Sequence, residues 1–324
     1  MVEKVVINAP AHLHVGNIDL TGDLGRLYGT LGFTLEYPRT VVSIEKSDKL
    51  VIKGKEEENA RKYVNESLKF LSIMEAKVKV EVKEAIPKHI GMGSQTALAL
   101  SIGLGLAKLY DIEADLKELA LALGRSTISA LGFYSFTYGG FLIDGGFRIE
   151  RKGKMVPPLI FRKEIPEDWF LVVAVPQKPL PKILRIKAEE DKILESLKPV
   201  PKEFSEKASR IVLMQIMPSA VEENIEDFGE GITKFNRLLG EFWKEKQGGL
   251  YCDPIVEKGI ELMLKNGAYG ACQTSWGPTF YGLVKGKDKT EELLVKIRKY
   301  INLNGGGFAF YTKVRNKGAK IEVL

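Results

Sequence analysis

The sequence predicts an α+β protein with two domains, and three observations lead to this prediction. The chain has 324 residues, enough for two hydrophobic cores, and 44% hydrophobic with 28% charged residues is a globular composition. In the first half, strand and helix patterns are mixed without a repeating βαβ series. In the second half, the order strand, helices, strand, strand, helix, strand is that of a ferredoxin-like layer. A Pro- and Lys-rich segment over 151–168 separates the halves and gives domains 1–165 and 166–324.

The first domain opens with elements that the spacing of its apolar residues predicts. We expect a strand over 4–15, a pair of strands over 41–44 and 49–53 joined by a Ser-Asp turn, a helix over 56–75 and a strand over 77–83. The helix has one apolar stripe, formed by Ala60, Tyr63, Val64, Leu68, Leu71 and Met74.

The centre of the first domain is expected to be a helix over 94–110. Its residues are apolar or small on nearly every side, which predicts burial all round. Asp115 with Glu118 forms a capping box for a short helix that ends at Gly124. Segments 141–144 and 147–150 are expected to form a hairpin that turns at Gly145-Gly146.

The second domain has the pattern expected of a layered sheet with extra helices. We expect strands over 169–175, 268–274, 279–284 and 308–314, and helices over 204–245, 253–266 and 289–300. Pro218 lies within the first helical stretch and should kink it.

Composition excludes several classes of protein. The formal net charge is +6, but Lys and Arg are spread among Asp and Glu, so a general preference for anions is expected rather than a nucleic-acid partner. Cys252 and Cys272 cannot form a disulfide framework or a zinc cluster. No apolar run would span a bilayer and residues 1–10 lack the order of a signal peptide, so we expect a cytoplasmic protein without a membrane partner.

The most informative segment is the glycine-rich turn before the buried helix. Gly91 and Gly93 allow a tight turn that exposes successive N–H groups, and the positive end of the helix points at the turn. We therefore expect Gly91, Gly93, Ser94, Gln95 and Thr96 to bind phosphate. The segment is neither a Walker A motif nor Gly-x-Gly-x-x-Gly, and a plain structural turn is the alternative.

Four stretches together resemble a known family. The turn with its helix resembles the second motif of the GHMP-kinase superfamily, whose first domain is like that of ribosomal protein S5. Three others resemble the archaeal β-ribofuranosylaminobenzene 5′-phosphate synthases of that superfamily: residues 12–26, the pair Gly124-Arg125 followed by Gly132 and residues 139–146, and residues 272–281. The last contains Ser275-Trp276-Gly277-Pro278, where the kinases have a third glycine-rich loop.

The resemblance implies a reaction at a sugar anomeric carbon. Phosphoribosyl pyrophosphate condenses with 4-aminobenzoate, or a related aromatic acid, and releases pyrophosphate and CO2 with Mg²⁺ as cofactor. The product feeds tetrahydromethanopterin-type cofactor synthesis, and the enzyme is expected to be a homodimer.

This chemistry suggests a role for each candidate residue. His14 is the expected acid or base, and Arg26 or Arg125 would bind a carboxylate or phosphate. Trp276, beside Ser275, would be a flat wall for the aromatic ring. Asp19 or Asp144 would hold the metal or stabilise the developing cation, with Ser94 as a further possible metal ligand.

Each candidate also has a structural interpretation. Asp19 and Asp144 adjoin turn residues, and Arg125 follows a helix end whose dipole it would neutralise. His14 would make a structural hydrogen bond, and Trp276 would belong to the core.

Two rival functions remain open at this point. An ATP-dependent GHMP kinase is favoured by the turn at 91–96 and disfavoured by Trp276 and Pro278. A non-catalytic RNA-binding protein would suit the basic charge, but Lys and Arg are not clustered with aromatic residues.

Overall fold

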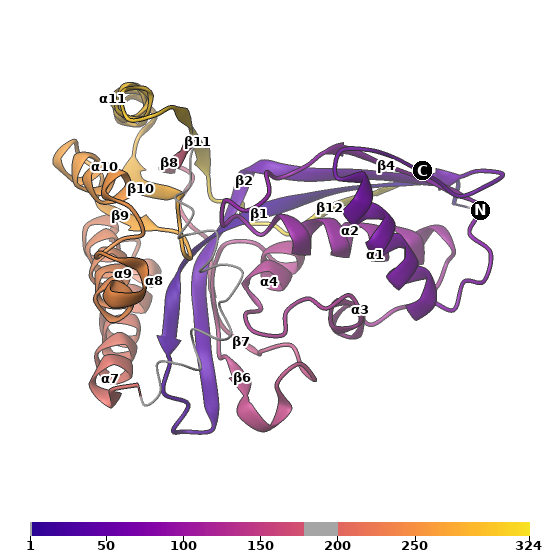
Figure 1. Cartoon of the computed structure of the whole chain (residues 1–324), viewed down its shortest axis with the longest axis horizontal. Coiled ribbons are helices and arrows are strands. Elements are labelled where there is room, and N and C mark those ends of the chain that lie inside the picture. The colour runs from indigo at the N-terminus through magenta and orange to yellow at the C-terminus, as the bar shows by residue number, and fades with distance from the viewer. Residues whose placement is uncertain (1, 178–199) are drawn as a thin grey trace.

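A computed structural model describes residues 2–177 and 200–324, which form two sheets with helices packed against them (Figure 1). Eight strands form the first sheet: β1 (Lys4–Asp19), β2 (Arg26–Lys46), β3 (Val51–Gly54), β4 (Val78–Glu84), β5 (Phe141–Asp144), β6 (Phe147–Arg148), β7 (Leu159–Lys163) and β12 (Lys320–Val323). Four helices lie along one face of it: α1 (Glu57–Phe70), α2 (Ser94–Leu109), α3 (Leu116–Ala122) and α4 (Leu131–Thr137). A short 3-10 helix, η1, spans Ile149–Arg151.

The second sheet confirms the ferredoxin-like order. Its strands are β8 (Trp169–Pro176), β9 (Gly270–Gln273), β10 (Phe280–Lys285) and β11 (Gly307–Lys313), arranged β11-β8-β10-β9 with every pair antiparallel. The helices of this half are α7 (Lys202–Ile211), α8 (Met217–Glu222), α9 (Ile225–Gln247), α10 (Pro254–Lys265) and α11 (Lys287–Leu303). The π-helical segment η2 (Val212–Ile216) joins α7 to α8, so the predicted long helix is interrupted just before Pro218.

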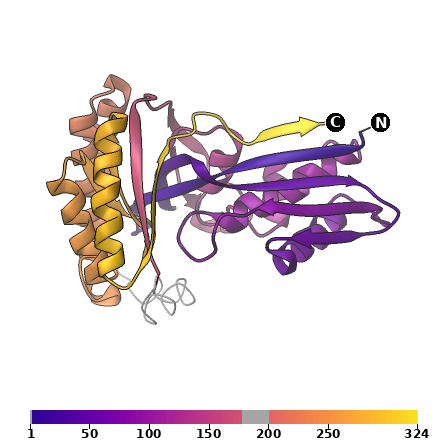
Figure 2. The ribbon, with the colours of Figure 1, turned by 90° about the horizontal axis from the view of Figure 1, so that it is seen from above.

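Strands β1 and β2 connect the two halves. They pair along almost their whole length and extend beyond α1–α4 towards α7 and α9 (Figures 1 and 2). Phe33 of β2 packs edge-on against Phe228 of α9 and Tyr281 of β10, with ring centroids 5.9 and 6.0 Å apart. A continuous hydrophobic core therefore runs from the first sheet into the second half.

Local sequence signals explain most element ends. Helix α2 buries side chains on every side, as predicted, because the first sheet, α1 and α3 surround it. Asp115 caps α3 by accepting hydrogen bonds from the backbone N–H groups of Lys117 and Glu118. Asp253 caps α10 in the same way.

Three local predictions were wrong. Strand β3 pairs in parallel with β4, Val51 opposite Lys79, and not with β2. Segments 141–144 and 147–150 do not form a hairpin: β5 pairs with β2 and β7, and β6 pairs with β2, because the long edge of β2 accepts both. Met74 is 98% exposed, since α1 ends at Phe70.

The division into domains 1–165 and 166–324 remains a prediction. β7 belongs to the first sheet and β8 to the second, so the connection between them falls at 164–168. The chain then returns, and β12 pairs with β1 in the first sheet. Among residues 2–177 and 200–324, no helix is both long and apolar enough to cross a membrane.

Candidate functional site

The predicted phosphate turn forms one wall of an open groove at the N-terminus of α2. Gly91 and Gly93 adopt φ angles of 79° and 73°, and α2 begins at Ser94 without an acidic residue in its first turn. The helix dipole and the free N–H groups of this turn therefore favour an anion. The groove has a volume of about 320 Å³ and is lined by His12, His14, Gly91, Met92, Gly93, Ser94, Gln95, Thr96, Arg125, Ser129, Gly132 and Ser275.

Glycine is required at position 93 because a histidine ring lies against it. A Cβ atom at Gly93 would come within 2.0 Å of His12 Cε1 and 2.3 Å of His12 Nδ1. A Cβ at Gly132 would come within 3.0 Å of the same carbon. The imidazole of His12 therefore packs against both Gly93 and Gly132.

Arg125 is the only Lys or Arg side chain among the described residues that line the groove. Its Nε donates to the carbonyl of Gly124 at 2.8 Å, as the helix-end interpretation expects. That bond uses one of five N–H donors, so the guanidinium still has donors for an anion in the groove. Gln95, also in the lining, accepts a hydrogen bond from Tyr63 at 3.0 Å.

Thr274, which follows β9, connects the phosphate turn with β1. Its fully buried hydroxyl donates to the Gly91 carbonyl at 3.1 Å and accepts from the His14 backbone N–H at 2.9 Å. The turn that follows is closed by hydrogen bonds from Gly277 N to Thr274 O and from Thr274 N to Thr279 O. Ser275 and Trp276 are therefore held in place next to β1.

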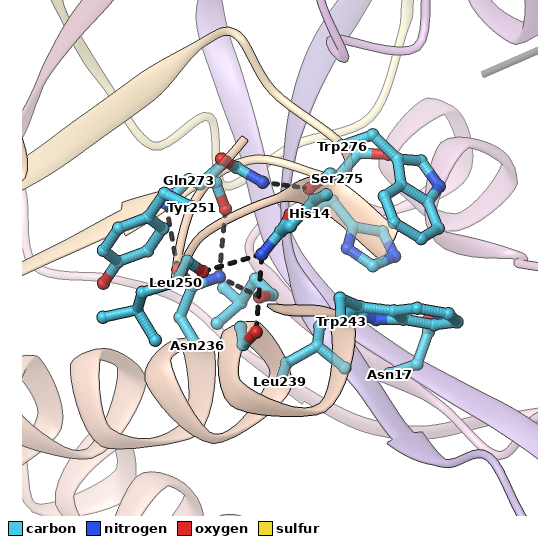
Figure 3. A pocket seen from close by; sticks show the side chains of 13 residues that line it. His14, Asn17, Asn236, Leu239, Trp243, Leu250, Tyr251, Gln273, Ser275 and Trp276 are labelled. Carbon is cyan, nitrogen blue, oxygen red and sulfur yellow. Dashed lines mark hydrogen bonds between the residues drawn. The ribbon is translucent and has the colours of Figure 1, made fainter. Parts of the chain in front are cut away.

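A second, smaller cavity, drawn in Figure 3, adjoins the groove. His14 and Ser275 line both, so the two spaces meet at these residues. The cavity has a volume of about 60 Å³ and is lined by His14, Val15, Asn17, Asn236, Leu239, Gly240, Trp243, Gln247, Leu250, Tyr251, Gln273, Ser275 and Trp276.

Two tryptophans form the aromatic wall of this cavity. Trp243 of α9 and Trp276 meet edge to face, with centroids 4.6 Å apart. Their exposed fractions are only 6% and 7%. Trp276 is thus buried, as the core interpretation expects, and it also lines the cavity.

Asn236 of α9 holds the cavity's polar side together. Its side chain donates to the carbonyls of Val15 and Gln273, at 2.7 and 3.0 Å, and accepts from the Gln273 N–H at 3.0 Å. Gln273 in turn accepts from the Cys252 N–H and donates to the Ser275 carbonyl. This network ties α9 to β1 and β9, and it satisfies polar groups that would otherwise be costly to bury.

Burial keeps the two histidines of the groove uncharged. Desolvation lowers the pKa of His14 to about 4, although its hydrogen bond with Asn17 opposes the shift. Desolvation and the neighbouring His14 lower the pKa of His12 to about 3. His14 Nδ1 is buried and has no hydrogen-bond partner within residues 2–177 and 200–324. His14 was expected to titrate near neutrality, but its lowered pKa favours the neutral imidazole at pH 7.

Asp19 lies outside both the groove and the cavity. Its Oδ1 accepts from Thr21 N, Thr21 Oγ1, Gly22 N and Ser205 Oγ at 2.7 to 3.1 Å. This is the arrangement of an Asx turn at the end of β1, tied to α7.

Arg26 and Asp144 also lie outside both spaces, at one structural corner. Arg26 donates to the carbonyls of Gly145 and Gly146 at 2.8 and 2.9 Å. Asp144, 1% exposed, accepts from the backbone N–H groups of Thr30, Ala130 and Gly146. Burial raises the pKa of Asp144 to about 6. Asp144 also has a side-chain hydrogen bond with Ser129, which lines the groove. Most of the hydrogen bonds of Arg26 and Asp144 go to backbone, so the structure favours a structural role for both.

The groove offers a poor set of ligands for Mg²⁺. Its lining includes hydroxyls from Ser94, Thr96 and Ser129 but no carboxylate, and the described residues contain no cluster of three or more His, Cys, Asp or Glu that could hold a metal. Proteins usually bind Mg²⁺ through one or two carboxylates together with substrate phosphates. These side chains do not make up a magnesium site by themselves, so we derive no step from the ion.

The sequence pointed to the groove but missed most of the cavity. Trp243 and Asn236 lie in an amphipathic helix, where an apolar or a small polar residue gives no functional signal. Thr274 was placed at the end of the predicted strand over 268–274, and nothing in the sequence indicated that its hydroxyl contacts the phosphate turn. His12 had a usable signal: it stands two residues before His14 in a strand, so both side chains lie on the same face.

The fold and the phosphate turn define the class of this protein. The GHMP kinases N terminal domain family matches residues 58–140, and the GHMP kinases C terminal family matches residues 216–303. Homoserine kinase from Cytophaga hutchinsonii has the same fold, with a TM-score of 0.72 over 99% of this chain and 98% of that one, at 15% identity. A mevalonate kinase from L. major, solved in complex with R-mevalonate, has a TM-score of 0.70 over 96% of each chain, at 13% identity. The fold class predicted from the sequence is confirmed.

Relatives with higher sequence identity identify the family within this class. β-Ribofuranosylphenol 5′-phosphate synthase of Methanothermobacter thermautotrophicus is 32% identical, covering 98% of this chain and 99% of that protein. The protein of the same name from Methanocaldococcus jannaschii is 33% identical, covering 98% and 100%. The chain belongs to the β-ribofuranosylphenol 5′-phosphate synthase family and is an enzyme of the pentosyltransferase class. The resemblance predicted from the sequence is confirmed.

Proposed function

We propose that this enzyme transfers the 5-phosphoribosyl group of phosphoribosyl pyrophosphate to the ring of an aromatic acid, with release of pyrophosphate and CO2. The observation that supports this most is the open anion groove at the start of α2. There, glycine backbone, helix dipole and Arg125 converge beside an aromatic-walled cavity. A phosphorylated sugar suits the groove because its charge meets N–H donors and a guanidinium.

The reaction balances without a proton. The bond from the anomeric carbon to pyrophosphate breaks, and its electron pair leaves with pyrophosphate. The ring carbon that bears the carboxylate forms a bond to the anomeric carbon. The bond to the carboxylate then breaks, CO2 leaves, and the electron pair restores the aromatic ring.

This balance changes the role that we assign to His14. Because ring substitution requires no general acid, His14 contributes as a neutral wall where the groove and cavity meet. A charged imidazolium there would repel the ribosyl cation that develops as pyrophosphate leaves. The uncharged ring avoids that repulsion.

The names of the relatives bear on the acceptor. Both are named for a ribofuranosylphenol product, which corresponds to a 4-hydroxybenzoate acceptor, whereas the sequence resemblance implied 4-aminobenzoate. The two acids differ only in the group opposite the carboxylate, and both are chemically competent because OH and NH2 each donate electrons to the ring. Mg²⁺ dependence, a homodimer, a cytoplasmic location and a place in tetrahydromethanopterin-type cofactor synthesis remain predictions.

The test is a substrate competition with purified protein. It is incubated with phosphoribosyl pyrophosphate and carboxyl-labelled 4-hydroxybenzoate or 4-aminobenzoate, with Mg²⁺ or with EDTA. We expect labelled CO2 and pyrophosphate in equal amounts from at least one acid. A parallel reaction with ATP and a small alcohol tests the kinase alternative. Phosphate transfer there, with no CO2 from either acid, would overturn the proposal.

A further inference from the structure

The cavity has features that the phosphate groove lacks. Its walls include Trp243 of α9 and Trp276 of the turn after β9, with Leu239 and Leu250 beside them and amide side chains on the polar side. No Lys or Arg is among the described residues that line it, whereas the groove contains Arg125. A flat aromatic ring with polar substituents suits the first space and a phosphorylated molecule suits the second.

We propose that the cavity is the acceptor subsite: the aromatic ring lies against Trp243 and Trp276, and its carboxylate-bearing edge faces His14 and Ser275. This inference rests on the proposed function. The orientation follows from geometry, since His14 and Ser275 are the residues that the cavity shares with the groove (Figure 3). The ring carbon that bears the carboxylate therefore meets the anomeric carbon at this junction.

The cavity must open to admit the acid. Its volume is about 60 Å³, whereas a protein cavity that binds benzene has about 150 Å³. Trp276 lies in the turn between β9 and β10, and the open groove reaches Ser275 beside it. A shift of this turn is the shortest way to enlarge the cavity from the groove side.

Two substitutions test the subsite with intact protein. Leu239→Phe fills the cavity without removing packing, and Trp243→Ala removes one aromatic wall, with Trp243→Phe as the conservative partner. Leu239→Phe and Trp243→Ala should each raise the KM for the acid at least tenfold, while Trp243→Phe should stay within about threefold. The dissociation constant for phosphoribosyl pyrophosphate, measured by calorimetry, should change less than twofold in all three.

Tryptophan fluorescence provides an independent measurement. The chain has three tryptophans. Trp169 lies in β8, apart from the cavity lining, so Trp169→Phe is the matched control and leaves Trp243 and Trp276 as reporters. Either acid should quench the emission of the control protein, and Leu239→Phe in that background should abolish the quenching.

The outcomes separate the two proposals. If the wild-type enzyme forms no product with either acid, the proposed function fails, and quenching alone decides whether the cavity binds aromatic acids. If the enzyme forms product but Leu239→Phe and Trp243→Ala retain the wild-type KM for the acid, the acceptor lies elsewhere and the subsite is wrong. An equal loss of affinity for phosphoribosyl pyrophosphate would also overturn it.

Discussion

The groove and the cavity meet at His14 and Ser275 but are built in different ways. The groove depends mainly on backbone: a short turn, two glycines with positive φ and a helix N-terminus within residues 91–96. The cavity depends on side chains from β1, α9 and the turn after β9, which are more than 200 residues apart at the extremes. A backbone site is encoded locally, whereas a side-chain site appears only when the fold brings distant segments together.

The largest expected effect concerns the histidine that borders both spaces. The pKa of His14 is lowered from 6.5 to about 4, so between these values the unfolded chain binds a proton that the folded protein does not. Stability from this group is complete above pH 6.5 and falls as the pH drops towards 4, by at most roughly 3.5 kcal/mol at about 1.4 kcal/mol per pKa unit. The loss of unfolding free energy should be smaller than this bound, because His14 is only half-buried. Water in the groove can therefore solvate the charged imidazolium.

Urea unfolding between pH 7 and 4 measures this effect. His14→Gln should make the fall in unfolding free energy clearly shallower than in the wild type. His89→Gln is the matched control, since His89 is exposed and outside both spaces. Identical pH slopes for His14→Gln and the wild type would mean that the pKa of His14 is the same in the folded and the unfolded protein.

The next effect tests whether the groove depends on backbone shape. Gly93→Ala places a Cβ 2.0 Å from the His12 ring, while Gly153→Ala adds one at a similar φ of 76° with nothing within 4 Å. Both variants carry the cost of a left-handed residue, about 1–2 kcal/mol. Only Gly93→Ala should lose activity, by about 100-fold, as expected for a misplaced binding group. Steady-state kinetics and thermal unfolding of both proteins measure this, and equal activity losses would contradict it.

The predictions from sequence succeeded where the signal was local. The phosphate turn, the all-round burial of α2 and the Asp115 cap each depend on residues within a few positions of one another. The ferredoxin-like order could be predicted from the sequence of strands and helices along the second half of the chain. The partners of β5 and β6 could not be predicted in this way, because the sequence does not reveal that β2 extends over 21 residues and pairs with both. Nor does it reveal that β3 pairs in parallel with β4. Likewise, Asp19, Arg26 and Asp144 resembled site residues because polar groups that hold turns and polar groups that bind substrates look alike in a sequence.

A smaller effect distinguishes the two arginines. Arg125→Lys should weaken binding of phosphoribosyl pyrophosphate about tenfold, because an ammonium cannot reproduce two parallel N–H bonds to a phosphate. Arg26→Lys should leave that affinity unchanged and lower the stability by about 1 kcal/mol, because its partners are the carbonyls of Gly145 and Gly146. Calorimetric titration and urea unfolding measure both quantities. If Arg26→Lys instead weakens the binding of phosphoribosyl pyrophosphate and Arg125→Lys does not, the anion site lies beside Arg26.

The smallest expected effect concerns Asp19, which the sequence suggested as a catalytic or metal-binding carboxylate. Its Oδ1 accepts hydrogen bonds from Thr21 and Gly22 within the turn after β1 and from Ser205 of α7. An asparagine retains that acceptor and suits an Asx turn. Asp19→Asn should therefore change kcat and both KM values less than about twofold, with a loss of stability below about 1 kcal/mol. Asp19→Ala is the comparison: it removes the acceptor and should lower the melting temperature but still leave kcat nearly unchanged. If Asp19→Asn instead slows turnover by about 100-fold or more at normal stability, the carboxylate charge takes part in the reaction. The active centre would then extend along β1 beyond the groove and the cavity.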